Sequence, residues 1–135
     1  MIEWINTTPK YKEIRSFYNE TNDCTVRAFA EVFNTSYDRA RRHLELNCGR
    51  KPRKGINSRQ TLPQSLKNTR YRVGAYSKAN RITISQFVKK HPIGRYYCCV
   101  RGHAIAIIDG VVYDYCHKPR RQITWAMRVY PNTDV

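Results

Sequence analysis

The sequence has 135 residues, of which 41% are hydrophobic, and 25 lysines and arginines against 10 aspartates and glutamates give it a formal net charge of +15. This length and apolar content exclude wholesale disorder and predict one domain over residues 1–135. The longest apolar run, over residues 104–108, is too short to span a membrane, and the N-terminus shows no signal-peptide pattern. We therefore expect no membrane association and a place of action in a reducing cytoplasm.

Helical patterns dominate the first half of the chain. Apolar residues recur with helical spacing in three segments, which predicts helices near residues 14–18, 24–34 and 37–46. A glycine-containing basic segment over residues 49–60 has no apolar periodicity and is predicted to be a loop. A short helical turn is expected over residues 61–66.

The second half is predicted to be mainly β. A weakly alternating strand comes first, and a short helix that starts at Thr83 and ends before Pro92 follows it. Asp109 and Gly110 form a strong hairpin signal between two apolar runs. The expected strands cover residues 71–76, 94–100, 103–108, 111–115 and 123–130, with the last at an edge of the sheet. Helices followed by antiparallel strands predict an α+β fold, a small antiparallel sheet with N-terminal helices packed on it.

The cysteines point to chemistry rather than to crosslinking. Their number is odd and no C-x-x-C pair occurs, which fits neither a disulfide framework nor a zinc cluster: Cys24, Cys48, Cys98, Cys99 and Cys116. No glycine-rich phosphate loop occurs either, so we expect neither a metal nor a cofactor. Cys24 follows a polar loop in which Asn22 or Asp23 would cap the second helix. At a helix N-terminus the partial positive charge lowers the pKa of a thiol.

The hairpin supplies two candidate partners for this thiol. His103 opens the buried strand, and an imidazole beside a thiol can accept its proton and later protonate a leaving group. With Asp109 and Gly110 as the central pair of the turn, Asp114 lies on the face of His103, two residues from its rung. A carboxylate there would fix the orientation of the imidazole.

Four other residues are weaker candidates for these roles. In the same register Cys116 faces His103. It is the second-choice nucleophile, because it is predicted to lie in a strand, where no helix N-terminus lowers the pKa of its thiol. Asp109 is the second-choice carboxylate, because the tip of a hairpin points away from the imidazole. As bases, His43 on a charged helix and His117 in a basic tail are less favoured.

Residues 22–28 (NDCTVRA) and 101–114 (RGHAIAIIDGVVYD) together resemble the papain-like cysteine peptidase superfamily. The resemblance is greatest to small bacterial and bacteriophage members related to the double-glycine leader peptidases. It implies a papain-like fold with Cys24 as nucleophile, His103 as general base and acid and Asp114 as the orienting residue. It also implies a bacteriophage protein that acts in the host cytoplasm.

The oxyanion hole departs from the pattern of this family. Leader peptidases carry a glutamine a few residues before the cysteine, whereas Tyr18 stands six residues before Cys24. A side-chain amide of Asn19 or Asn22, together with the backbone N–H of Cys24, is the expected replacement.

Basic residues are concentrated in three segments and predict an acidic partner, either a protein or peptide substrate or nucleic acid. No known nucleic-acid-binding motif accompanies them. They are Arg39, Arg41, Arg42, Arg50, Lys51, Arg53, Lys54, Arg59, Lys118, Arg120 and Arg121. The sequence thus predicts a cysteine hydrolase (peptidase, isopeptidase or amidase) or acyl transferase acting on an acidic or nucleic-acid-associated partner. The alternative is a catalytically idle papain-like scaffold that binds nucleic acid or an acidic host protein.

Overall fold

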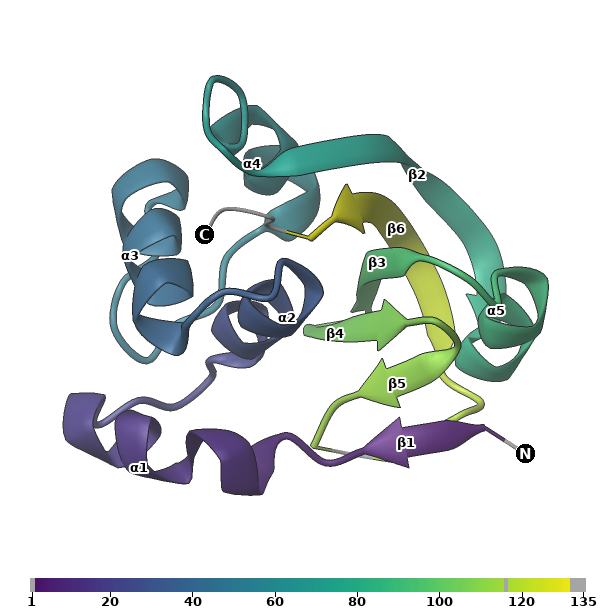
Figure 1. The fold of residues 1–135 in the computed structure, drawn as a ribbon, viewed down its shortest axis with the longest axis horizontal. Coiled ribbons are helices and arrows are strands. Elements are labelled where there is room, and N and C mark those ends of the chain that lie inside the picture. Colours follow the sequence, from purple (N-terminus) through teal and green to yellow (C-terminus); the bar gives the residue numbers. More distant parts are fainter. Residues whose placement is uncertain (1, 116, 132–135) are drawn as a thin grey trace.

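The computed structural model of the chain describes residues 2–115 and 117–131 and has an α+β architecture (Figure 1). Helices fill most of the first half and strands most of the second, as predicted. In chain order the elements are β1 (Glu3–Ile5), α1 (Thr8–Tyr18), α2 (Cys24–Val32), α3 (Tyr37–Cys48), α4 (Ser58–Ser65), β2 (Arg72–Thr83), α5 (Ile84–Lys90), β3 (Arg95–Val100), β4 (His103–Ile108), β5 (Val111–Tyr113) and β6 (Gln122–Tyr130).

α2 is the central helix of the molecule. Val26 and Phe29 have no exposed surface, and every residue from Thr25 to Val32 is buried. The amphipathic pattern predicts one buried face and one exposed face, but in the structure the polar face of α2 is buried as well. Arg27 and Glu31 are buried in ion pairs, the former with Asp23 and the latter with Lys10.

The helix boundaries agree with several local signals. Ser36 caps α3 by accepting a hydrogen bond from Arg39 N, and Gly49 ends that helix with a positive φ of 69°. Thr83 and Gln86 form a reciprocal capping box at the start of α5. α4 begins at residue 58, three residues before the predicted turn, because the side chain of Asn57 caps it.

The six strands form one sheet in the order β1-β5-β4-β3-β6-β2. β1 runs parallel to β5 and every other pairing is antiparallel. The prediction that β6 lies at an edge is wrong, since it pairs with β3 on one side and β2 on the other. β2 is also twice as long as the predicted strand over 71–76. It runs from residue 72 to 83 and takes the edge position.

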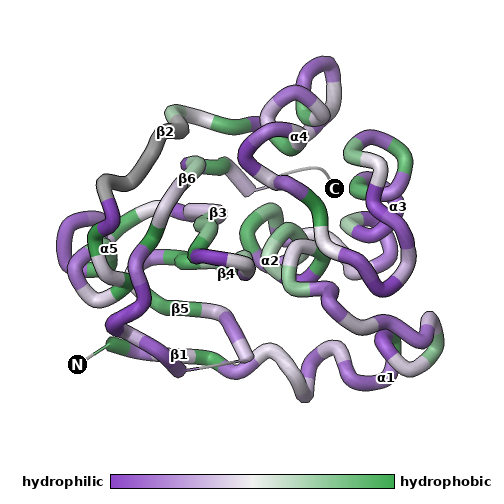
Figure 2. The backbone as a smooth tube through the Cα atoms, turned by 180° about the vertical axis from the view of Figure 1, so that it is seen from behind, coloured by the Kyte–Doolittle hydropathy of each residue, from purple (hydrophilic) through white to green (hydrophobic). Residues whose placement is uncertain are grey.

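The sheet separates two hydrophobic cores. One contains residues of α1 to α4 and of the sheet face that carries Tyr97, Ala104 and Trp125. The other lies beneath α5, against the face that carries Tyr96 and Ile105. Figure 2 shows hydrophobic residues in α2 and in the central strands and mostly hydrophilic ones in the outer loops. Within the described ranges, no helix has the length and apolar character needed to cross a membrane.

Candidate active site

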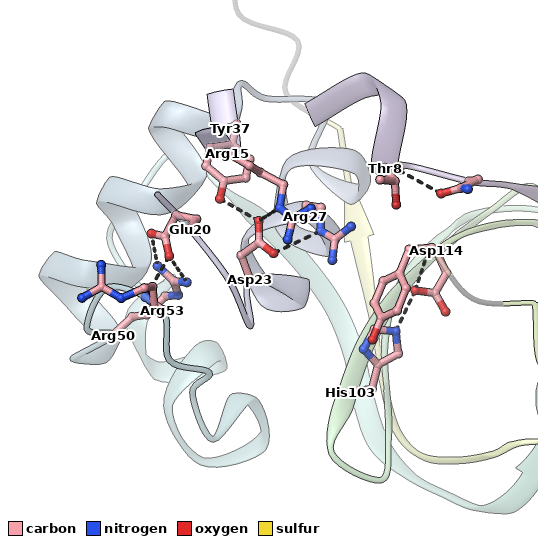
Figure 3. A network of polar contacts seen from close by, with 12 residues as sticks. Thr8, Arg15, Glu20, Asp23, Arg27, Tyr37, Arg50, Arg53, His103 and Asp114 are labelled. Carbon is pink, nitrogen blue, oxygen red and sulfur yellow. Dashed lines mark hydrogen bonds and ion pairs between the residues drawn. The ribbon is translucent and has the colours of Figure 1, made fainter. Parts of the chain in front are cut away.

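The β4–β5 hairpin brings His103 and Asp114 together. Its register pairs Ile108 with Val111 around the Asp109–Gly110 turn, as predicted. β5 ends at Tyr113, two residues earlier than expected, because the next backbone N–H leaves the ladder and donates to Ile5 O of β1. This turns Asp114 toward the start of β4, where His103 Nε2 lies 2.7 Å from Asp114 Oδ1 (Figure 3).

Cys24 is the first residue of α2 and lines both lobes of a cleft together with His103, whose imidazole acts on the pKa of its thiol. Because Asp114 occupies Nε2, Nδ1 is the ring nitrogen left for the thiol. Burial acts to raise the pKa of Cys24, but the hydrogen bonds from His103 and from the Ala104 backbone N–H outweigh it. These bonds and the positive charges of His103 and Arg27 bring the pKa below its ordinary value.

The His103 imidazole shifts in the opposite direction. Burial favours the neutral ring, but the hydrogen bonds to Asp114 and Cys24, together with their negative charges, raise its pKa to about 9. The ring of Tyr115 contacts it edge-on, with centroids 4.9 Å apart. A thiol with a lowered pKa beside an imidazole with a raised pKa favours the thiolate–imidazolium form near neutral pH.

Asp23 occupies the N-cap position as predicted, but its side chain does not cap the helix. The carboxylate is fully buried and accepts hydrogen bonds at Oδ2 from Arg15 Nε (2.9 Å) and Tyr37 OH (2.7 Å). It thereby ties α1 and α3 to the start of α2. The contacts hold the N-terminal turn that carries Cys24, which leaves the backbone N–H groups there free of a side-chain acceptor.

The cleft has two lobes, which meet at the Cys24 thiol and the His103 imidazole. Cys24, His103, Gly55 and Gly102 line both lobes. The larger lobe has a volume of about 940 Å³ and is walled by residues 55–59, the β3–β4 turn and the start of β6. The smaller lobe, of about 390 Å³, lies toward α1. The chain therefore provides room on both sides of the thiol, which the sequence did not indicate.

The three candidate donors of the oxyanion hole differ in how close they lie to the cleft. The first helical hydrogen bond of α2 runs from Arg27 N to Asp23 O, so the N–H of Cys24 lies before it and has no partner within the helix. Asn22 lines the smaller lobe, and its Nδ2 donates to Arg53 O at 3.1 Å. Asn19 ends α1 in a left-handed conformation, is exposed and lines neither lobe. This position does not support a role for Asn19 as donor.

The weaker candidates lie elsewhere. Asp109 accepts from Gly94 N at the tip of the hairpin. His43 is buried against Phe29 and bonds to Ser65, and burial lowers its pKa. His117 packs edge-on against Trp4. Cys116 falls outside the described residues.

Two of the eleven predicted partner-binding residues are engaged inside the protein. Arg50 is buried and binds both oxygens of Glu20, and Arg41 lies 2.6 Å from the same carboxylate. The expectation that Arg50 forms part of a surface for a partner is therefore wrong, while the half-buried Arg41 already has Glu20 as a partner. Eight others are exposed: Arg39, Arg42, Lys51, Arg53, Lys54, Arg59, Lys118 and Arg120. Arg121 is half-buried.

Arginines also line the larger lobe. Arg59 and Arg121 belong to the predicted segments, while Arg81 and Arg101 were not singled out because they are isolated in the sequence. No aspartate or glutamate is among the described residues that wall this lobe.

Comparison of the sequence with models of known protein families, with curated proteins and with solved structures gives no match.

Proposed function

We propose that the protein is a papain-like cysteine hydrolase that attacks an amide or isopeptide carbonyl. The observation that carries the proposal is the chain of contacts from Cys24 through His103 to Asp114. The opposite pKa shifts of the thiol and the imidazole support it, since a nucleophilic thiolate and a proton donor are then present together. The two-lobed cleft supports it as well, because an acyl substrate extends to both sides of the bond that is cleaved.

The reaction proceeds in two steps. The Cys24 thiolate bonds to the carbonyl carbon, and the carbonyl electron pair moves to oxygen, which faces the N–H of Cys24. When that pair returns, the C–N bond breaks and the His103 imidazolium gives its proton to the leaving amine. Neutral His103 then takes a proton from water, the resulting hydroxide bonds to the thioester carbon, and the thiolate leaves. An amine in place of water gives acyl transfer.

The excess of positive charge and the arginines of the larger lobe extend the proposal to an acidic partner. The resemblance to bacteriophage and bacterial peptidases extends it to a host cytoplasm as the place of action.

The test is acyl-enzyme formation with p-nitrophenyl acetate, which needs no knowledge of the natural substrate. We expect release of p-nitrophenolate with an acetyl group on Cys24 by mass spectrometry. Cys24→Ala abolishes both, and His103→Ala slows release by about 10²–10⁴-fold, the usual contribution of general acid–base catalysis. Cys48→Ala, which removes a buried thiol of α3 that lines neither lobe, is the control and retains the wild-type rate. Equal release by wild type and Cys24→Ala would refute the proposal.

A second candidate is an idle scaffold that binds nucleic acid through the exposed basic loop of Lys51, Arg53 and Lys54. It requires that the biological activity survive Cys24→Ala, whereas the hydrolase requires that it be lost.

A further inference from the structure

Arg27 shares a face of α2 with Cys24, because residues three apart lie one turn along the same side of a helix. It lines the smaller lobe of the cleft together with Cys24 and His103. The side chain is only 8% exposed. In Figure 3 it extends from α2 toward the side on which His103 and Asp114 lie.

The guanidinium group of Arg27 is incompletely satisfied. Its Nε lies 3.4 Å from Asp23 Oδ1, an ion pair without hydrogen-bond geometry. Both Nε and Nη1 are buried and have no hydrogen-bond partner within residues 2–115 and 117–131. Nε faces Asp23 Oδ1, which has no hydrogen-bond partner of its own, so Nη1 is the donor left open among the described residues. Buried donors in folded proteins are nearly always paired, so an open Nη1 on a buried arginine at a cleft indicates a group that binds there.

The charge around Arg27 favours an anion. Asp23 is the one carboxylate among the described residues that line the smaller lobe, and Arg15 and Tyr37 already bond to its Oδ2. Two arginines therefore face a single carboxylate beside the N-terminus of α2. The lobe is completed by the polar side chains of Thr8 and Asn22 and by Tyr115.

Tyr115 holds the Arg27 guanidinium next to the reacting groups. The guanidinium carbon lies 4.8 Å from the centroid of the Tyr115 ring, and the same ring contacts the His103 imidazole. An anion bound at Arg27 is therefore adjacent to the thiol and the imidazole rather than on a distant surface.

We propose that the smaller lobe is a carboxylate subsite in which Arg27 binds a carboxylate of the substrate close to the acyl group that Cys24 attacks. The inference rests on the proposed function and names its substrate class, an acidic polypeptide. The proposed hydrolysis needs an acyl carbon, which favours a polypeptide over a nucleic acid as the bound polyanion. The open Nη1 of the guanidinium can donate a charge-assisted hydrogen bond to an oxygen of a carboxylate. That carboxylate belongs either to an acidic side chain or to the C-terminus of the substrate.

The first experiment compares two alkylating agents that differ only in a carboxylate and an amide. In both, the Cys24 sulfur bonds to the methylene carbon and iodide leaves. The measured quantity is the rate of alkylation by iodoacetate divided by the rate of alkylation by iodoacetamide, in 0.15 M salt. We expect this ratio to be about tenfold higher at Cys24 than for free N-acetylcysteine, since a charged hydrogen bond contributes about that factor. Arg27→Gln lowers the ratio about tenfold, and Arg27→Lys lowers it less.

Arg72→Gln is the matched control, because it removes the same charge from an exposed position that lines neither lobe. It keeps the ratio of the wild type. Equal losses in Arg27→Gln and Arg72→Gln would overturn the inference, since the preference would then reflect the general positive field. A ratio equal to that of N-acetylcysteine in the wild type would overturn it as well.

A second measurement needs no variant and remains valid if Arg27→Gln fails to fold. Ligands are tested for protection of wild-type Cys24 against iodoacetamide. N-acetylglutamate α-amide presents a side-chain carboxylate, N-acetylglutamine presents an α-carboxylate, and N-acetylglutamine α-amide presents neither. We expect protection by one or both of the first two and none by the third, with the stronger of the two identifying the source. Equal protection by all three, or by inorganic phosphate, would overturn the carboxylate subsite.

The outcomes separate the inference from the function on which it rests. If Cys24 reacts with iodoacetamide no faster than the half-buried Cys99, the hydrolase itself is refuted. If Cys24 reacts faster but shows neither a carboxylate preference nor protection, the subsite alone is refuted.

Discussion

Two thiols line the larger lobe of the cleft, and their surroundings shift their pKa values in opposite directions. Burial raises the pKa of Cys99 to about 12 despite a hydrogen bond with Ser58. Cys24 is also half-buried, but the imidazole and the N–H of Ala104 stabilise its thiolate. The difference arises from the partners of each sulfur, so the surroundings favour the thiolate at Cys24 and the thiol at Cys99.

Asp114→Asn tests the partner on the other side of the imidazole. The raised pKa of His103 keeps the proton that the leaving group needs up to about pH 9, and activity is lost as the pH rises through that value. Without the Asp114 carboxylate the pKa of His103 falls. With an anilide substrate, whose leaving amine must take up a proton, the alkaline limb of hydrolysis therefore moves to lower pH in a rate–pH profile.

Asp109→Asn is the control for this measurement, because it makes the same substitution at the tip of the same hairpin, facing Gly94. We expect its alkaline limb to remain in place. An unchanged limb in Asp114→Asn would contradict the orienting role of Asp114.

The placement of Cys24, His103 and Asp114 could be predicted from the sequence because it depends on local rules. A capping signal marks the helix start and a two-residue turn fixes the hairpin register. Arg27 could have been noticed from its spacing to Cys24, but its buried open donor could not. Arg50 was misassigned to the surface because its partner, Glu20, is thirty residues away in the sequence.

At the scale of elements, Glu20 anchors the loop that walls the cleft. Its carboxylate accepts two hydrogen bonds from Arg50 (2.9 and 3.0 Å), one from Arg41 and one from the Arg53 backbone N–H (2.8 Å). The loop continues directly into Gly55, which lines both lobes. The Glu20 carboxylate therefore links three segments through hydrogen bonds: the turn after α1, the helix α3 and this loop.

Glu20→Gln tests this anchor through stability. Burial opposes ionisation, but the arginine hydrogen bonds lower the pKa of Glu20 from about 4.5 to about 2. Because the pKa of Glu20 is lower in the folded protein than in the unfolded chain, its ionised carboxylate stabilises the fold at any pH above about 4.5. This stability is lost as the pH falls from 4.5 toward 2. The shift corresponds to about 3 kcal/mol. In urea titrations, Glu20→Gln is less stable by about that amount at neutral pH and lacks this part of the acid dependence.

Glu13→Gln is the matched control, since Glu13 is exposed on α1. We expect it to retain the stability and the acid dependence of the wild type. If Glu20→Gln has the same acid profile as Glu13→Gln, the anchor does not contribute as described.

Elements with local signals were predicted well, and elements that depend on distant partners were not. α3, α5 and the β4–β5 turn carry caps or turn residues within a few positions. β1 has only three residues and exists because it pairs with β5, more than a hundred residues away. No local pattern could have indicated it.

At the scale of the whole molecule, the order of the strands is set by long-range pairing. β6 alternates buried and exposed residues, a pattern equally compatible with an edge and with a central position. Its place between β3 and β2 follows from the packing of the entire sheet. The class of the fold was therefore predictable, and the neighbours of β6 were not.

The net charge of +15 predicts general polyanion binding that depends strongly on salt. In fluorescence titrations with single-stranded DNA, we expect binding at low salt that is lost near physiological salt. The logarithm of the affinity falls with the logarithm of salt by about 0.7 per phosphate contacted. Removing the charges of Lys51, Arg53 and Lys54 together reduces this slope, and so does removing three exposed charges elsewhere. Tight binding at physiological salt that depends on this loop alone would instead favour the nucleic-acid-binding scaffold.

The most direct test of the central claim is the rate at which iodoacetamide alkylates each cysteine of the native protein across the pH range, followed by mass spectrometry. The account predicts that Cys24 reacts far faster than Cys48 and Cys99 near neutral pH. It also predicts that His103→Ala moves the rise in the Cys24 rate to alkaline pH, because the thiol then loses the partner that lowers its pKa. A Cys24 rate near neutral pH no higher than that of Cys48, or unaffected by His103→Ala, would contradict it.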